Sequence, residues 1–221
     1  MSRTITIACV TACAPVAIWL VDDGSVIQGA SAADEMALCD FHGGFCRMTL
    51  MDSFLSHPLG AILVFTIVVG VVSTLILDLY ALVLEKAVGI PQSNWGAVGH
   101  WLLGMTRGQF VFSPTSSGVY TPGEHGLGWL FHYVVGCAYA AMLPVFWGTG
   151  YIAAPGWMPV ILIGFVLTTI AGLTLMVPGM GGGFLGLKTP NPLKLYGLVL
   201  LAHAVFTIGQ YVTASAFAAC F

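Results

Sequence analysis

The sequence predicts an all-α integral membrane protein built around a four-helix bundle. Of its 221 residues, 58% are hydrophobic and only 7% are charged, and the mean hydropathy is +0.95, whereas about a quarter of the residues in soluble domains are charged. Four long apolar runs cover about residues 59–84, 126–148, 157–177 and 195–218. A helix needs ~20 mostly apolar residues to cross ~30 Å of hydrocarbon, so each run is long enough to span a bilayer.

The N-terminal segment, residues 1–56, precedes the predicted transmembrane domain of residues 57–221 and has three alternative interpretations. The apolar stretch from Thr4 to Val21 is typical of an uncleaved signal anchor, which would add a fifth helix. Cleavage after Ala30-Ser31-Ala32, which has the small-residue pattern of a signal-peptide site, is the second alternative. In the third, translation starts at Met51 and the preceding residues are not made.

Cys39 and Cys46 lie in this N-terminal segment. If the segment is exported, both thiols face an oxidising compartment, where disulfides form and persist. The short separation along the chain allows a closed loop of standard disulfide geometry. We therefore expect a Cys39–Cys46 disulfide if the segment is made and exported.

The few basic residues predict the orientation of the bundle. Lys86 and Arg107 lie between the first two runs, and Lys188 and Lys194 lie between the last two. Loops rich in Lys and Arg stay in the cytoplasm. Both of these loops should therefore be cytoplasmic, and the C-terminus should be extracytoplasmic.

Each apolar run carries small and polar residues at helical spacing, which predicts the faces through which the helices pack. Three of these residues are ionisable: Asp78, His132 and His203. Measured from the midpoint of each run at ~1.5 Å per residue, they lie ~10, ~7 and ~5 Å toward the cytoplasm. The sequence therefore predicts one intramembrane polar cluster, which could be a structural hydrogen-bonded lock, a proton or ion site, or part of a metal site. The sequence contains no His, Cys or carboxylate spacing that identifies a particular metal ion.

Two loops contain further candidate residues. The segment from Ser93 to Gly104 has capping residues, two tryptophans and a histidine, and predicts a short interfacial or re-entrant helix. The loop from Pro178 to Pro192 is rich in glycine and is expected over the mouth of a cavity. Its formal GxGxxG pattern is weak evidence for a nucleotide site, because it follows a membrane helix rather than a strand. The loop candidates are Trp95, His100, Trp101, Gly179, Gly181 and Lys188.

Several of these motifs together resemble the domain of unknown function 2938 family. The resemblance covers about residues 57–218 and rests on Asp78, Asn94-Trp95, Gly99, the region of Glu124 and Gly128, His132-Tyr133, Pro178-Gly179-Met180-Gly181, Thr189-Pro190-Asn191-Pro192, and His203 with Phe206. It implies a small bacterial inner-membrane protein with four helices. It implies no particular activity.

Three functional classes remain open at this point. A small transporter or ion-coupled carrier would use the Asp and His cluster as a protonatable site. An assembly or scaffold protein would need only complementary helix faces. A membrane enzyme would need a metal or cofactor that the sequence does not identify. The sequence therefore favours a non-enzymatic role. The lipid bilayer is the expected partner, with a second copy or another membrane protein as further candidates. Nucleic-acid binding is excluded, because the basic residues form no patch.

Overall fold

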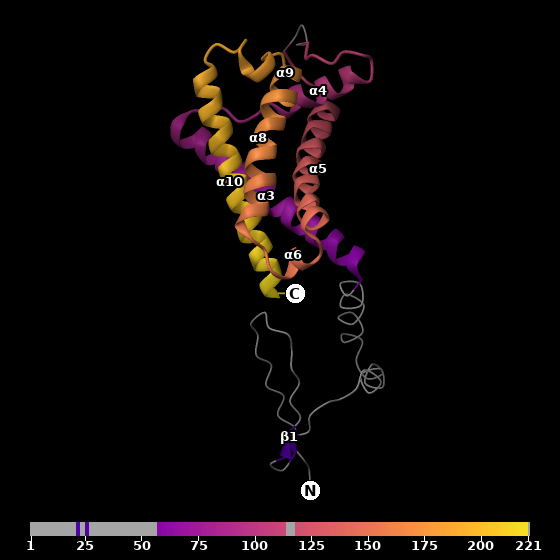
Figure 1. Cartoon of the computed structure of the whole chain (residues 1–221). Coiled ribbons are helices and arrows are strands. Elements are labelled where there is room, and N and C mark those ends of the chain that lie inside the picture. The colour runs from indigo at the N-terminus through magenta and orange to yellow at the C-terminus, as the bar shows by residue number, and fades with distance from the viewer. Residues whose placement is uncertain (1–20, 23–24, 27–56, 114–117, 221) are drawn as a thin grey trace.

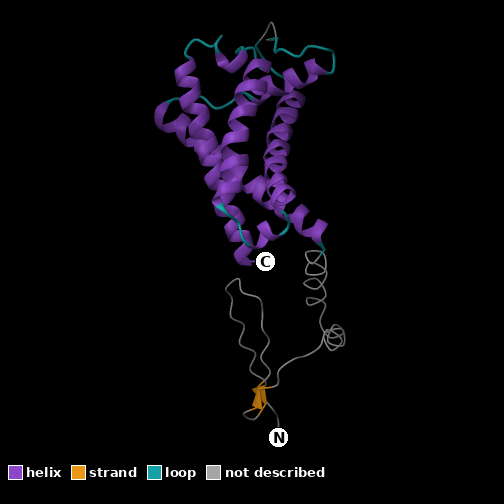
Figure 2. Ribbon diagram, in the orientation of Figure 1, coloured by secondary structure: helices purple, strands orange, loops and turns teal. Residues whose placement is uncertain are grey.

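The computed structural model describes residues 21–22, 25–26, 57–113 and 118–220. Cys39, Cys46 and the predicted N-terminal helix up to residue 20 lie outside these ranges. The strand β1 (Val21–Asp22) pairs antiparallel with β2 (Ser25–Val26), and Val21 lies opposite Val26. The rest of the described chain is helical or forms loops between helices (Figure 2).

Four helices in the described residues are long and apolar enough to cross a membrane. Figure 1 shows three of them side by side, with the strongly inclined α3 crossing behind. Each predicted run lies in one of these helices, apart from the residue at position 148, and the all-α four-helix fold class is confirmed. The four spans are α3 (Pro58–Val88), α5 (Pro122–Trp147), the composite helix Trp157–Gly179 and α10 (Pro192–Cys220).

The third span is not a regular α-helix. Two π-helical segments, which the sequence did not predict, interrupt it. Short π-helical turns inside α-helices often occur at functional sites. In order, its segments are α7 (Trp157–Val160), η1 (Ile161–Leu167), α8 (Thr168–Ala171), η2 (Gly172–Met176) and α9 (Val177–Gly179).

Local sequence signals explain where the spans begin and end. Helix α3 ends at Gly89, whose left-handed backbone (φ 72°) lets its N–H bond the carbonyl of Glu85 at 3.0 Å. Helix α5 begins with a capping box, in which Thr121 and Glu124 satisfy each other's backbone N–H groups. At the start of α10, the Asn191 side chain accepts a hydrogen bond from the backbone N–H of Lys194.

The helices approach each other through the small-residue faces that the sequence predicted. A methyl group on Gly70 of α3 would overlap the backbone of Cys137 on α5. A methyl group on Gly164 of η1 would overlap the buried side chain of Gln210 on α10. Such close backbone approach is how membrane helices gain packing energy without a hydrophobic driving force.

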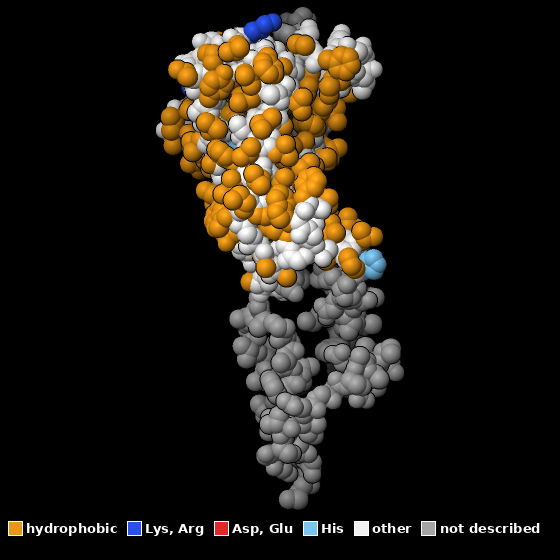
Figure 3. Space-filling view, in the orientation of Figure 1, with side chains coloured by type: hydrophobic (Ala, Val, Ile, Leu, Met, Phe, Trp, Pro, Cys, Tyr) orange, Lys and Arg blue, Asp and Glu red, His pale blue; other side chains and the backbone are white. Residues whose placement is uncertain are grey.

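The two ends of the bundle differ in how they are filled. An apolar core lies at the end near α6 (Gly150–Ala153), where Phe65 makes edge contacts with Tyr151 and Phe217. The opposite end carries α4 (Trp95–Met105), η3 (Phe184–Gly186) and the connecting loops (Figure 1). Apolar side chains cover the flank of the bundle in Figure 3, as expected for a surface that faces lipid.

The predicted short helix between the first two spans is present as α4. Its first turn is capped by the Asn94 side chain, which accepts a hydrogen bond from the N–H of Ala97 at 3.1 Å. The residues Gly96, Ala97, Val98 and Gly99 at its start are buried. Helix α4 is therefore packed into the end of the bundle.

Candidate functional site

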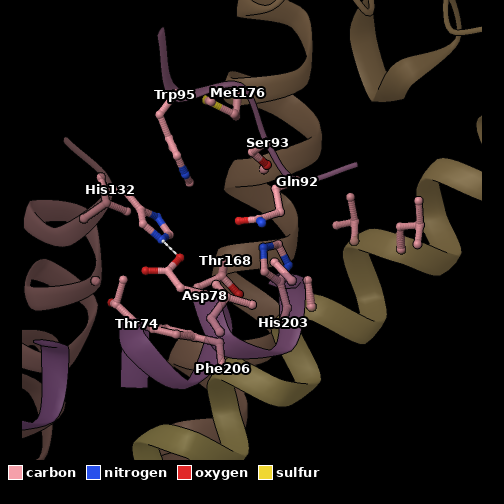
Figure 4. A pocket seen from close by; sticks show the side chains of 18 of the residues that line it. Thr74, Asp78, Gln92, Ser93, Trp95, His132, Thr168, Met176, His203 and Phe206 are labelled. Carbon is pink, nitrogen blue, oxygen red and sulfur yellow. Dashed lines mark hydrogen bonds and ion pairs between the residues drawn. The ribbon is translucent and has the colours of Figure 1, made fainter. Parts of the chain in front are cut away.

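A cavity of about 700 Å³ lies among the spans at the α4 end of the bundle. Its volume is within the ~300–1,000 Å³ typical of small-molecule sites. Most of its lining is apolar or aromatic, with contributions from all four spans, α4 and the loop before α4 (Figure 4). The polar lining residues are Thr74, Asp78, Tyr80, Gln92, Ser93, His132, Tyr139, Thr168 and His203.

The carboxylate of Asp78 is the centre of the polar part of this cavity. His132 Nε2 lies 2.8 Å from Asp78 Oδ1, and the Tyr133 hydroxyl donates to Asp78 Oδ2 at 2.8 Å. Both the Asp78 and His132 side chains are largely buried, at 21% and 12% exposure. An ionised carboxylate only accepts hydrogen bonds, so with Asp78 ionised the imidazole donates to it.

The backbone contact between α3 and α5 brings this pair together. Thr74 lies one turn before Asp78, and Gly136 lies one turn after His132. A methyl group on Gly136 would overlap the Thr74 hydroxyl, which itself donates to the carbonyl of Gly70 at 2.7 Å. Because the two helices touch here, side chains of ordinary length on the next turn reach each other.

Helix α4 contributes an aromatic wall beside the pair. The Trp95 ring stacks on the His132 ring with a centroid distance of 4.0 Å and an interplanar angle of 29°. Trp95 also lies 5.6 Å from the ring of Trp129 on α5. The position of α4 therefore determines the surroundings of His132.

Glycines hold α4 against α5. A methyl group on Gly99 would overlap the carbonyl oxygen of Glu124, and one on Gly128 would overlap the carbonyl oxygen of Trp95. Beside these contacts, His100 Nδ1 lies 2.6 Å from Glu124 Oε1. The other carboxylate oxygen of Glu124 accepts from the backbone and hydroxyl of Thr121, at 2.6 and 2.9 Å. His100 thus anchors α4 to the capping box of α5.

The third residue of the predicted cluster, His203, has a different partner. Its Nδ1 lies 3.0 Å from the hydroxyl of Thr169 on α8. It lines the same cavity as Asp78 and His132, and Figure 4 shows its ring facing the shared space from α10. The structure therefore pairs two of the three residues and places the third on the wall of the same cavity.

Two of the loop candidates line the cavity, whereas the glycine-rich loop does not. Trp95 and Trp101 line the cavity, and the indole N–H of Trp101 donates to the carbonyl of Phe110 at 2.8 Å. None of residues 178–192 is a lining residue, so the glycine-rich loop with Gly181 and Lys188 does not cover the cavity as expected. Instead Gly179 packs under the Trp101 ring, where a larger residue would overlap it.

Sequence reasoning missed several contributors to the site. In the sequence Tyr133 stands out only as part of the His132-Tyr133 motif, yet its hydroxyl bonds Asp78. Gln92 and Ser93 line the cavity from the loop before α4, where no periodicity indicated a role. The signal that could have located the α4 anchor was the Thr-x-x-Glu pattern at residues 121–124, a recognisable capping box.

The arrangement supports hydrogen bonding and proton exchange. A carboxylate and an imidazole line a cavity large enough for an organic molecule, and the Tyr133 phenol, which is not a lining residue, bonds the carboxylate. Among the residues that the structure describes, no group of three or more His, Cys, Asp or Glu side chains is placed to hold a metal ion. The site therefore offers proton-bearing groups and aromatic surface.

Comparison with known families assigns the chain. The model of the family described as "Protein of unknown function (DUF2938)" matches residues 67–217, which is well over half of the sequence. The chain belongs to this family.

Neither curated proteins nor solved structures give a match. The DUF2938 match begins within α3 and ends within α10, so it includes Asp78, His132 and His203. With its four apolar spans, this DUF2938 member is a multipass membrane protein.

Proposed function

We propose that this protein is a proton-coupled carrier of a small solute, which binds in the cavity beside Asp78 and His132. The observation that supports this function best is a hydrogen-bonded carboxylate–imidazole pair lining an organic-sized cavity inside a membrane bundle. A carboxylate at depth in a span costs ~2.5–3.5 kcal/mol by insertion scales. A purely structural role would not require a cavity beside such a group.

The pair gives a physical basis for coupling solute binding to a proton. Imidazole is the side chain whose ordinary pKa, ~6.5, is close to physiological pH. A solute that hydrogen-bonds to Asp78 shares the carboxylate with His132, and so changes how strongly the pair holds a proton. By thermodynamic linkage, the protonation state then changes the affinity for the solute by the same factor.

The uneven filling of the bundle is consistent with one state of such a carrier. The cavity lies toward the α4 end, while Phe65, Leu143 and their neighbours fill the α6 end. Access from the other side would require this core to open and α4 to close more tightly on the cavity. We expect the backbone of η2, whose Gly172 and Leu175 line the cavity, to rearrange in that step.

Transport by proteoliposomes tests the proposal. The purified protein is reconstituted, an inside-acid or an inside-alkaline pH gradient is imposed in separate experiments, and uptake from a mixture of cationic, neutral and anionic solutes is measured by mass spectrometry. We expect at least one solute to accumulate above protein-free liposomes, and the accumulation to be lost when the gradient is collapsed. The Asp78→Asn variant should lose it as well, because a neutral amide cannot exchange the proton.

The Glu85→Gln variant is the matched control for Asp78→Asn. It removes one negative charge from the same helix, but Glu85 is not a lining residue and a glutamine can still accept from Gln92. It should transport like the wild type. Folded wild-type protein that accumulates no solute above the liposome background would rule out the carrier function.

We further propose that the protein lies in a bacterial inner membrane with its C-terminus extracytoplasmic. The support is that Lys86, Arg107, Lys188 and Lys194 all lie at or beyond the span ends on the α4 side, opposite α6 (Figure 1). A reporter active only in the cytoplasm should be active when inserted near Arg107 and inactive when fused after the C-terminus. The reverse pattern would contradict this orientation.

A further inference from the structure

We propose that the solute bound in this cavity is an organic ammonium ion, an amine with an apolar or aromatic body. This inference rests on the proposed function for the site, and it adds the charge and the chemical class of the ligand. Three features of the cavity carry it: the charge of its lining, the free hydrogen-bonding capacity of Asp78, and its aromatic surface.

The charge of the lining favours a cation. The cavity is lined by one carboxylate, Asp78, and two imidazoles, and by no lysine or arginine. The four basic residues whose side chains the structure describes, Lys86, Arg107, Lys188 and Lys194, all lie outside it. An anionic solute would meet a carboxylate and no permanent positive charge. A cation would supply the counter-charge that a carboxylate in a low-dielectric site requires.

The geometry at Asp78 leaves room for another donor. Each carboxylate oxygen accepts one hydrogen bond, from His132 and from Tyr133. A carboxylate has about four acceptor positions, so each oxygen can accept one more. An ammonium N–H can therefore reach Asp78 while His132 and Tyr133 hold it in place. Ammonium–carboxylate hydrogen bonds are among the strong ones in proteins.

The rest of the cavity fits an apolar body. Trp95, Trp101, Phe131 and Phe206 line it together with aliphatic side chains of α10 and η2. Figure 4 shows Trp95 on the His132 side of Asp78, and Phe206 on the floor of the same space. Aromatic faces close to a carboxylate attract an ammonium group through the ring quadrupole as well. The volume of about 700 Å³ leaves space for a chain or ring system beyond the head group.

Ligands with one body and different head groups test this class directly. The probes are 6-phenylhexylamine, 6-phenylhexanol, 6-phenylhexanoate and the 6-phenylhexyltrimethylammonium ion. Their binding to the full-length protein in lipid nanodiscs is measured by calorimetry, and the heat measured with protein-free nanodiscs is subtracted. Hydrogen bonds to charged groups contribute about 1.5–3 kcal/mol. We therefore expect the amine to bind about 10-fold or more tightly than the alcohol or the carboxylate. The trimethylammonium ion, which has the charge but no N–H, should fall between.

Variants of Asp78 test whether its carboxylate causes the preference for the amine. Asp78→Asn should weaken amine binding about 10-fold or more and leave alcohol binding unchanged. Asp78→Glu should restore the preference for the amine, and Glu85→Gln should bind like the wild type. If Asp78→Asn does not fold, the head-group series on the wild type still decides the question.

The outcomes separate this inference from the carrier function. An alcohol or carboxylate that binds as tightly as the amine would overturn the amine class, as would amine binding that a folded Asp78→Asn variant retains. Proton-dependent uptake of a neutral or anionic solute would do the same while leaving the carrier function intact. Amine binding at Asp78 without uptake would contradict the carrier function and support the ligand class.

Discussion

Alanine at Gly128 should undock α4 from the bundle. The added methyl group would overlap the carbonyl oxygen of Trp95, a backbone atom that cannot move without moving α4. Overpacking of this kind costs about 1–3 kcal/mol, so we expect a clear loss of thermal stability in detergent. Since Trp95 stacks on His132, its fluorescence environment should change as well. Gly99→Ala should act in the same way, because its methyl group would overlap the carbonyl oxygen of Glu124.

The control for this prediction lies on the same helix. A methyl group on Gly126 would meet nothing within 4 Å, and alanine is a better helix former than glycine by about 1 kcal/mol. Gly126→Ala should therefore be neutral or stabilising. Equal stability of the Gly126→Ala and Gly128→Ala variants would mean that α4 does not depend on the close contact.

Asp78 and His132 should show strong coupling in a double-mutant cycle. They are in direct hydrogen-bonding contact at 2.8 Å, and contacting residues usually couple by about 0.5–3 kcal/mol. Unfolding free energies of Asp78→Asn, His132→Gln and the double variant give the coupling energy. The single variants should cost more in sum than the double variant, because either substitution alone already removes the same carboxylate–imidazole interaction.

A parallel cycle with His203→Gln tests whether the predicted three-residue cluster is one network. In the structure His203 bonds Thr169, so its coupling to Asp78 should be smaller than that of His132. Additive effects of Asp78 and His132 would show that the pair contributes only as separate packing residues. Equal coupling in both cycles would instead place His203 in the same network, through the shared cavity.

The contacts of Asp78 show how far sequence reasoning could go at the site. An ionisable residue inside an apolar run stands out, because hydrocarbon penalises charge, and this property distinguishes Asp78, His132 and His203 in the sequence. The partner of each group was not predictable. One further turn along α5 would have changed which residue faces Asp78, and the close contact of α3 with α5, at Thr74 against Gly136 and at Gly70 against Cys137, sets that register. The role of Tyr133 follows from the same contact.

The sequence alone determined the number of spans, the packing faces and the end of the bundle that carries the basic residues. These follow from local physics: apolar length against bilayer thickness, small residues at helical spacing, and charges excluded from hydrocarbon. The tertiary structure decided that α4, and not the glycine-rich loop, borders the cavity with Trp95 and Trp101. It also decided the π-helical form of the third span and the pairing of His100 with Glu124. These depend on how closely two backbones approach, which is a property of both helices together and is encoded in neither one alone.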